Sequence, residues 1–354
     1  MPRAGIVTLA GKPNAGKSTL LNRLIGQRLS ITSPKPQSTR DRVVGILTRG
    51  QLDDPADSSS ALTADRAIDQ AVEPSQLILF DTPGLIEPRD DLQRSMRTAA
   101  LMALADADVI VYLADATAGT PPSLELAAGL NTRLRAPVIL ALNKIDTVPA
   151  HRRAAFDPSP PPDSDFATAA DPDPSREPSI PTSVERASNA GPATGSGYAG
   201  SFLISAVTGE GVEAMLDAVT ALLPESPFLY PADDVSTQSV RFFVTELIRE
   251  TAFEQLDQEL PYSLAAQVEE FREDRSPVYI RAFIYVERDS QQGILVGHKG
   301  SRIREIGRAA RIKIEQLIDA PVYLDLRVKV LPNWRRDPDA LRRFGYLAPP
   351  AHRG

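Results

Sequence analysis

The first 225 residues alternate between two patterns of apolar positions. Short apolar runs bounded by turn residues indicate buried strands, whereas apolar residues three or four positions apart indicate helices. Because strands and helices alternate, we expect an α/β fold, a mostly parallel sheet with helices on both faces. The expected strands are 5–10, 42–48, 77–81, 108–114, 137–143 and 201–205, and the expected helices are 17–26, 91–105, 122–134 and 210–222.

Two segments interrupt this alternation. Residues 50–76 are polar and weakly periodic, and residues 147–200 contain ten of the 31 prolines. Neither segment has enough apolar residues to offset the entropy that ordering would cost. We therefore expect two disordered or loosely ordered insertions on the surface.

A different order of elements follows a stretch with three prolines between 224 and 236, which indicates an interdomain linker. We place the first domain at 1–224, the linker at 225–236, a second, α+β domain at 237–332 and a C-terminal tail at 333–354. The second domain is expected to contain a helix at about 238–257, strands at 264–271, 278–287 and 321–331, a helix leading into residue 297, and a helix at 301–318.

Length and composition set limits on the class of protein. The 354 residues suit two domains, and 42% hydrophobic residues suffice for their cores. No apolar stretch approaches the ~18 residues that span a bilayer, so we expect a soluble cytoplasmic protein. The chain has no cysteine, which excludes disulfides, cysteine zinc sites and thiol catalysis.

The net charge of -7 is unevenly distributed. Residues 1–225 carry 20 basic and 27 acidic side chains, whereas residues 226–354 carry 19 of each. A local basic patch can bind phosphates even in an acidic chain. Such a patch lies at 297–313, where the only acid is Glu305 and the basic residues are Lys299, Arg302, Arg304, Arg308, Arg311 and Lys313.

Residues 11–18, GKPNAGKS, match the G-x-x-x-x-G-K-[ST] phosphate-binding loop between a strand and a helix. Glycines at 11 and 16 let the backbone N–H groups surround phosphates at the positive end of the next helix. Lys17 would reach the β- and γ-phosphates, and Ser18 would ligate Mg²⁺. The loop residues expected to bind nucleotide are Gly11, Asn14, Ala15, Gly16, Lys17, Ser18 and Thr19.

The motif NKID at 143–146 indicates guanine as the base. The Asp146 carboxylate can accept hydrogen bonds from guanine N1–H and the 2-amino group, a donor pair that adenine lacks. Asn143 would meet the ring edge and hold the phosphate loop, and the Lys144 stem would lie along the base. Ser205 and Ala206, after the last expected strand, would offer a backbone N–H to guanine O6.

Two further segments complete the expected site. Asp81 follows the strand LILF and is placed to hold Mg²⁺ through water, and the Gly84 amide would meet the γ-phosphate. Of Ser38 and Thr39, we choose Thr39 to close over Mg²⁺ and the γ-phosphate. The expected metal ligands are thus Ser18, Thr39 and Asp81, and the expected catalytic residues are Lys17, Thr39 and Gly84.

Leu85 stands where many small GTPases place a glutamine that orients the attacking water. Leucine cannot polarise water, so we expect slow intrinsic hydrolysis that relies on backbone groups, Mg²⁺, an added cation or a partner. Asn14 is a candidate to help hold that cation, K⁺, although it could equally stabilise the loop. A scaffold that binds GTP but hardly hydrolyses it remains an alternative, and so does an ATP-dependent kinase, which Asp146 argues against.

These motifs, followed by Gly297-His298-Lys299-Gly300, resemble those of the Era family of bacterial GTPases. The resemblance covers both domains and includes SITSPKPQSTRDRVVGI, DTPGLIEP, ELPYS, ILVGHKGSRIREIG and LRVKVLPNW. It implies a type II KH fold for the second domain, in which the Gly-x-x-Gly loop admits the nucleic-acid backbone beside an apolar groove. The implied RNA-binding residues are Gly297, His298, Lys299, Gly300, Arg302 and Arg304.

The same resemblance implies cofactors and partners. It implies a GTPase that uses GTP/GDP and Mg²⁺, binds the 3′ end of 16S ribosomal RNA through the KH domain and assists maturation of the 30S ribosomal subunit. Some members of the family also associate peripherally with membrane, so the inner face of the cell membrane is a second expected location. We expect a monomer.

Overall fold

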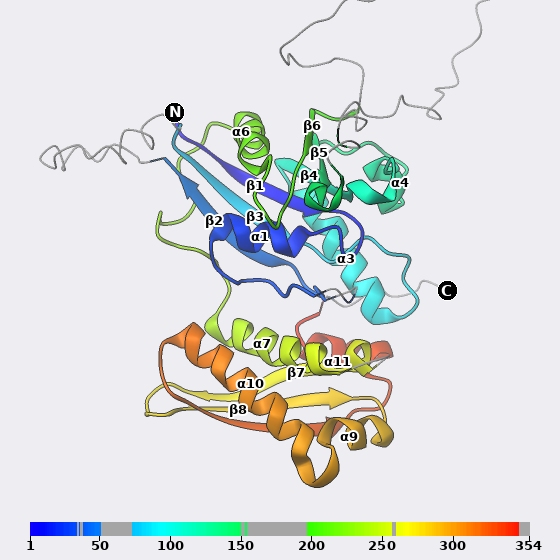
Figure 1. Ribbon diagram of the computed structural model, residues 1–354, viewed down its shortest axis with the longest axis vertical. Coiled ribbons are helices and arrows are strands. Elements are labelled where there is room, and N and C mark those ends of the chain that lie inside the picture. Colours follow the sequence, from blue (N-terminus) through cyan, green and yellow to red (C-terminus); the bar gives the residue numbers. More distant parts are fainter. Residues whose placement is uncertain are drawn as a thin grey trace, which may run out of the picture.

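The computed structural model describes residues 1–33, 35, 38–50, 73–149, 153, 197–256 and 260–346. They form two units, drawn one above the other in Figure 1. Most of the two expected insertions lies outside the described residues. The described ends of the insertions already belong to the first sheet, because β3 (Ser75–Asp81) and β6 (Gly200–Leu203) begin inside the expected ranges.

The first unit has a six-stranded sheet in the order β2-β3-β1-β4-β5-β6. Strand β2 is antiparallel to β3, and the other neighbours are parallel, which confirms the α/β prediction. Each strand begins and ends within two residues of the bounds expected from the sequence. The strands not yet bounded are β1 (Arg3–Ala10), β2 (Val43–Arg49), β4 (Val109–Asp115) and β5 (Val138–Asn143).

Helices cover both faces of this sheet (Figure 1). The apolar sides of α1 (Lys17–Ile25) and α6 (Val212–Leu222) pack on one face, and those of α3 (Asp91–Asp106) and α4 (Leu124–Ala128) pack on the other. The expected helix at 122–134 was too long. Helix α4 ends at Ala128 because Gly129 adopts a left-handed conformation with φ of 65°.

The second unit has a three-stranded sheet in the order β7-β8-β9, comprising β7 (Ala265–Arg272), β8 (Val278–Val286) and β9 (Val322–Val330). Strand β8 pairs antiparallel with β7 and parallel with β9. Three helices bury their apolar sides on one face of this sheet, in the order expected for the second domain. These are α7 (Val240–Gln255), α9 (Asp289–Val296) and α10 (Ser301–Ile318).

The segment expected to be a tail is packed as far as Tyr346. Trp334 is fully buried and, with the helix α11 (Pro338–Arg343), covers part of the other face of the second sheet next to the start of α3. The few apolar residues of this segment lie among arginines and prolines, so the sequence shows no apolar pattern from which their packing in one cluster could be predicted. Besides α11, the short helices that the sequence did not predict are α8 (Leu260–Ser263), η1 (Ala116–Ala118), η2 (Ile145–Thr147), η3 (His298–Gly300) and η4 (Trp334–Arg336).

The end of the expected linker is bonded to edge strand β2. The Ile46 N–H donates to the Val235 carbonyl over 2.9 Å, and the Val44 N–H donates to the Gln238 side chain over 2.9 Å. Unpaired groups on the edge of a sheet are available for such bonds. The linker therefore reaches α7 along β2. Within the described part of the chain, no helix combines the length and the apolar character that crossing a bilayer requires.

Candidate nucleotide site and nucleic-acid interface

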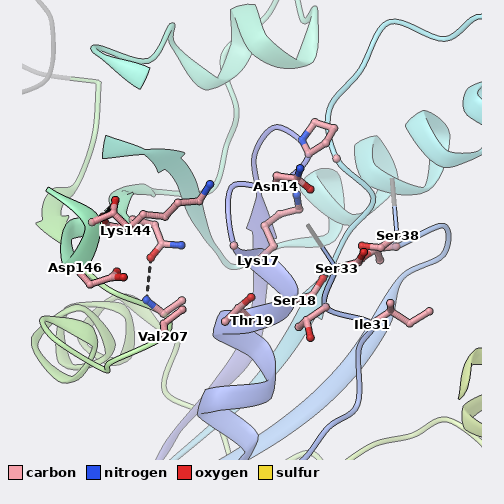
Figure 2. A pocket seen from close by; sticks show the side chains of 18 residues that line it. Asn14, Lys17, Ser18, Thr19, Ile31, Ser33, Ser38, Lys144, Asp146 and Val207 are labelled. Carbon is pink, nitrogen blue, oxygen red and sulfur yellow. Dashed lines mark hydrogen bonds between the residues drawn. The ribbon is translucent and has the colours of Figure 1, made fainter. Parts of the chain in front are cut away.

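A cavity of about 560 Å³ lies at the carboxyl ends of the parallel strands in the first domain (Figure 2). This edge of a parallel sheet is where α/β proteins generally bind ligands. The cavity brings together residues that lie far apart in the chain. Its lining includes Pro13, Asn14, Gly16, Lys17, Ser18, Thr19, Ile31, Thr32, Ser33, Ser38, Thr39, Gly84, Asn143, Lys144, Asp146, Thr147, Ala206 and Val207.

The expected phosphate loop connects β1 to α1 at one end of the cavity. Gly16 precedes α1 in a left-handed conformation with φ of 97°, which favours glycine. The Lys17 ammonium crosses the loop and donates to the carbonyls of Gly11, over 3.1 Å, and Lys12, over 3.0 Å. The loop is thus closed around its lysine, and the amino end of α1 faces the cavity.

Three hydroxyls meet one carboxylate beside this loop. Ser18 Oγ donates to Asp81 Oδ2 over 2.6 Å, and Thr39 Oγ1 lies 2.9 Å from Ser18 Oγ. Thr39 Oγ1 also lies 3.5 Å from Asp81 Oδ2. Ser30 Oγ donates to the same Asp81 oxygen over 2.6 Å. The three expected metal ligands therefore lie together, and Ser30 is a further member that the sequence analysis missed.

The environment of this cluster affects its charges. Burial raises the pKa of the Asp81 carboxyl, while Lys17 and the hydroxyls of Ser18, Ser30 and Thr39 act in the opposite direction. Burial also lowers the pKa of Lys17 to about 8, with Asp81 opposing the shift. Asp81 is fully buried, and its Oδ1 has no hydrogen-bond partner among the described residues. A buried carboxylate oxygen without a hydrogen-bond partner is suited to binding a cation or a water molecule bound to a cation.

The expected base-reading residues form the other end of the cavity. The Asn143 side chain donates to the Ala15 carbonyl over 2.8 Å and accepts from the Ala206 N–H over 2.9 Å. A Cβ on Gly16 would lie 2.1 Å from Asn143 Nδ2, so glycine leaves the space that this bond needs. Ser205 Oγ donates to Asp146 Oδ1 over 2.6 Å, which orients the carboxylate.

Lys144 contributes in a different way. Its ammonium forms an ion pair with Asp115 Oδ2 at 2.7 Å, which fixes the side chain along this end of the cavity. Figure 2 shows Lys144 and Asp146 across the cavity from Lys17 and Ser18. The cavity therefore has one end with the Lys17 ammonium and hydroxyl groups, and another end with the Asp146 carboxylate and the Lys144 ammonium.

The segment after Asp81 approaches the phosphate loop closely. A Cβ on Gly84 would lie 2.6 Å from the backbone nitrogen of Pro13, and the Leu85 N–H donates to the Gly11 carbonyl over 3.0 Å. The Leu85 side chain is 6% exposed and belongs to the apolar cluster around Ile110 and Tyr112. This position therefore supplies a backbone group and no polar side chain.

The Gly-x-x-Gly loop joins α9 to α10 in the second domain. Gly297, Lys299 and Gly300 all have positive φ, of 71°, 48° and 75° respectively. The side chains of His298 and Lys299 are exposed, whereas Arg304 turns back to donate to the carbonyls of Lys299, over 2.9 Å, and Gly300, over 3.1 Å. Arg304 thus braces the loop, a contact that the sequence analysis did not foresee. Arg302 is partly buried, and its Cβ would be 2.9 Å from a Cβ placed on Gly297.

A groove of about 340 Å³ lies between α10 and β9. Its walls combine apolar side chains with arginines, as expected for a surface that takes bases and phosphates together. The lining residues are Ile303, Arg304, Gly307, Arg308, Arg311, Val322, Tyr323, Leu324 and Leu326.

Comparison with known proteins identifies the family. A family model for 50S ribosome-binding GTPases matches residues 6–144, and a KH-domain model matches residues 259–335. GTPase Era of Nocardioides sp. is 37% identical over 351 residues, which cover 97% of this chain and 96% of that protein. GTPase Era of Halothermothrix orenii is 36% identical over 345 residues, which cover 97% of this chain and 98% of that protein. This chain belongs to the Era family of GTPases.

Two solved Era structures match both domains. Era in complex with MgGDPNP and nucleotides 1506–1542 of 16S ribosomal RNA superposes with a TM-score of 0.76 at 32% identity, covering 98% of this chain and 99% of that one. An Aquifex aeolicus Era variant bound to GDP and AlF₄⁻ gives a TM-score of 0.74 at 32% identity, covering 97% of this chain and 99% of that one. The prediction of a P-loop GTPase domain followed by a KH domain is therefore confirmed.

The site of this Era family member includes residues that no motif indicated. Thr32, Ser33, Thr147 and Val207 line the cavity, and Ser30 contacts Asp81. Ser30, Thr32 and Ser33 lie in the stretch SITS, so the available signals were its closeness to the expected switch threonine and its place in the stretch SITSPKPQSTRDRVVGI that resembles the family. Val207 and Thr147 each follow a residue or motif already chosen, and adjacency could have suggested them.

Proposed function

We propose that this Era family member binds GTP in the cavity of its first domain, hydrolyses it to GDP and phosphate, and couples the nucleotide state to RNA binding by its KH domain. The observation that carries the proposal is the Asn143 side chain, which bonds the loop residue Ala15 to Ala206 next to Asp146. This contact supports a base reader and a phosphate loop at opposite ends of one cavity.

Guanine selection follows from the chemistry of Asp146. Its carboxylate is held by Ser205 and can accept from N1–H and the 2-amino group of guanine. Adenine offers no such donor pair and would leave the carboxylate without a partner. The same argument weighs against an ATP-dependent kinase, and competition between GDP and ADP for the cavity separates the two functions.

Ser18, Thr39 and Asp81 suit Mg²⁺ because they supply oxygen ligands and one negative charge beside the phosphate loop. The unpartnered Oδ1 of Asp81 supports this assignment. When bound, Mg²⁺ neutralises negative charge on the β- and γ-phosphates. Of the chain's own groups, Lys17 would stabilise phosphate oxygens, and the Gly84 amide would meet the γ-phosphate.

Hydrolysis is proposed to be slow in the isolated protein. The buried, apolar Leu85 cannot orient the attacking water, so that task is left to backbone groups and to an added cation or partner. Asn14 lines the cavity with a positive φ of 61° and is our candidate to help hold K⁺ near the phosphates. Phosphate release measured with K⁺ and with Na⁺ tests this role.

The RNA partner is inferred from the solved Era complex with nucleotides 1506–1542 of 16S ribosomal RNA. We infer that the Gly297–Gly300 loop admits the RNA backbone and that the groove between α10 and β9 receives bases from the 3′ end of 16S ribosomal RNA. The role that follows is assistance in maturation of the 30S subunit. A monomer in the cytoplasm, with peripheral association at the inner face of the cell membrane, completes this proposal.

Multiple-turnover phosphate release tests the enzymatic proposal, measured with and without K⁺ and ribosomal subunits. Sustained turnover that subunits accelerate supports a hydrolysing switch. A single binding event with no turnover under any of these conditions would favour the second candidate, a GTP-gated scaffold, which the burial of Leu85 motivates. Crosslinking and sequencing of RNA bound in cells tests the ribosomal partner.

A further inference from the structure

One arginine of the first domain holds a segment of the second. Arg40 directly follows Thr39 in the chain, and it is only 4% exposed. Its guanidinium donates to the Leu264 carbonyl over 2.5 Å and to the carbonyls of Pro261 and Tyr262 over 3.1 Å each. All three acceptors belong to α8 or to the residue that follows it, at the start of the second sheet.

The geometry of these bonds explains why an arginine is needed. The last carbonyls of a helix have no partners within that helix, and α8 has only four residues. Residues 261–264 have four carbonyls. Arg40 donates to three of them, and the Trp334 indole N–H donates to the fourth, that of Ser263, over 2.9 Å. The Arg40 guanidinium also lies 5.9 Å from the centre of the Trp334 ring. A lysine ammonium could not reproduce this planar, multidentate contact.

Two other bonds anchor the same region of the first domain. Arg28 Nη2 lies 2.6 Å from Glu250 Oε1 on α7, and Lys35 Nζ donates to the Phe253 carbonyl over 2.9 Å near the end of α7. Among the described residues, side chains of Arg28, Lys35 and Arg40 thus attach the stretch before β2 to the second domain. Arg40 is next in the chain to Thr39, which contacts Ser18 and Asp81.

Thr39 and Arg40 have different partners: Thr39 contacts Ser18 and Asp81, whereas Arg40 contacts carbonyls of the second domain. We propose that Arg40 is a positioning residue for GTP hydrolysis, which holds Thr39 against the Ser18–Asp81 pair by binding the carbonyls of residues 261–264. The proposal rests on the proposed function, because that function gives Thr39 its place at the metal ion and γ-phosphate. In this proposal the second domain helps to position Thr39 in the hydrolytic site.

The test compares Arg40→Gln and Arg40→Lys with the unmodified full-length protein. We expect kcat for GTP to fall about 10–100-fold in both variants, because displacing a catalytic group by about 1 Å costs up to that factor. GDP affinity should stay within about twofold, since Thr39 is assigned to the γ-phosphate. Arg40→Lys keeps the positive charge, and its kcat alone provides the test if Arg40→Gln does not fold. Arg42→Gln is the control, because the Arg42 side chain contacts Phe80 and Asp106 within the first domain.

A double-mutant cycle with Thr39→Ala separates positioning from a general structural role. If Arg40 acts through Thr39, adding the Arg40 substitution to Thr39→Ala should change kcat by less than about twofold. An equal loss of kcat in both backgrounds, or an unchanged kcat in a folded Arg40 variant, would overturn the inference. An unchanged kcat in Thr39→Ala alone would instead overturn the role that the proposed function gives to Thr39.

Discussion

Asn143 donates its side-chain amide to the Ala15 carbonyl over 2.8 Å, and this bond joins two motifs that lie 128 residues apart. Asn143 is 2% exposed, so each end of its side chain depends on protein partners. Its oxygen accepts from the Ala206 N–H. The segment proposed to read the base and the phosphate loop are therefore positioned by the same side chain.

Asn143→Ala should weaken GDP and GTP binding by about 10–100-fold. The substitution leaves the Ala15 carbonyl and the Ala206 N–H without their partner, and a buried unsatisfied group costs ~1–3 kcal/mol. Because the change acts on the shape of the whole cavity, the variant should weaken guanine and xanthine nucleotides by similar factors. Titration calorimetry measures both affinities, and an unchanged GDP affinity would contradict the positioning role.

Asp146→Asn should instead change which base is preferred. An amide can donate to the carbonyl that xanthine carries at C2, where guanine carries its amino group, so preference should move from GDP towards XDP. Complementarity at a buried polar site is worth ~10⁴-fold in discrimination. Asp217→Asn provides a matched control, because it removes one carboxylate that pairs with Arg49 and does not line the cavity. A variant that still prefers GDP over XDP would show that another residue reads the base.

The nucleotide cavity was largely predictable because its motifs are contiguous and their order along the chain fixes their order in a parallel sheet. Asp81 and Asn143 each end a buried strand, so both had to reach the same edge. Ser30 could not be predicted in this way. It contacts Asp81 across 51 residues, and its own segment has no regular secondary structure.

The contacts between the two domains could not be predicted from the sequence for a similar reason. The bonds from Arg40 to the carbonyls of 261–264 depend on tertiary placement, and backbone acceptors leave no mark in a sequence. Trp334 is aromatic, but the residues that follow it are polar, so the pattern predicts a tail. Hydrophobic periodicity finds elements that bury a whole face and overlooks a single buried side chain.

GDP affinity should fall as the pH rises through 8. Burial lowers the pKa of Lys17 to about 8 in the protein without nucleotide, and bound phosphates favour the protonated ammonium. Binding above pH 8 therefore requires proton uptake, and affinity should drop about tenfold between pH 7 and 9. Fluorescence titration with a labelled GDP across this range measures the effect. Lys17→Met should bind more weakly and lose this dependence; an equal pH profile in both proteins would assign the titration to another group.

Removing residues 154–196 should preserve folding and GDP binding. Arg153 Nη1 lies 2.9 Å from Glu210 Oε1, and the Tyr198 ring is 6.4 Å from the Tyr112 ring, so the flanking residues belong to the first domain. Replacing the segment by a Gly-Ser linker about a quarter as long changes closure entropy by only ~1 kcal/mol. Thermal unfolding and GDP titration measure the outcome. A longer deletion that also takes Tyr198 should lower the melting temperature, and loss of GDP binding in the shorter deletion would show that the insertion is structural.

Replacing His298 and Lys299 with Asp should weaken RNA binding without altering GDP affinity. Both side chains are exposed on the loop between α9 and α10, where two carboxylates would face the RNA phosphates at close range. Each lost phosphate contact also reduces the salt dependence of binding, so the slope of log affinity against log salt should become less steep by about one. Gel-shift titration with the 3′ end of 16S ribosomal RNA, with GTP present, measures affinity and slope together.

The matched control for that experiment is Arg133→Asp combined with Arg135→Asn, which changes the net charge by the same amount on the exposed surface of the first domain. Long-range repulsion would weaken RNA binding in both double variants, whereas a clamp at the Gly-x-x-Gly loop would be affected only in the first. The control should therefore bind RNA within about twofold of the unmodified protein, because charges beyond a Debye length of ~8–10 Å are screened. Equal affinities in both double variants would mean that this loop does not hold the RNA backbone, and the groove between α10 and β9 would then have to bind RNA without it.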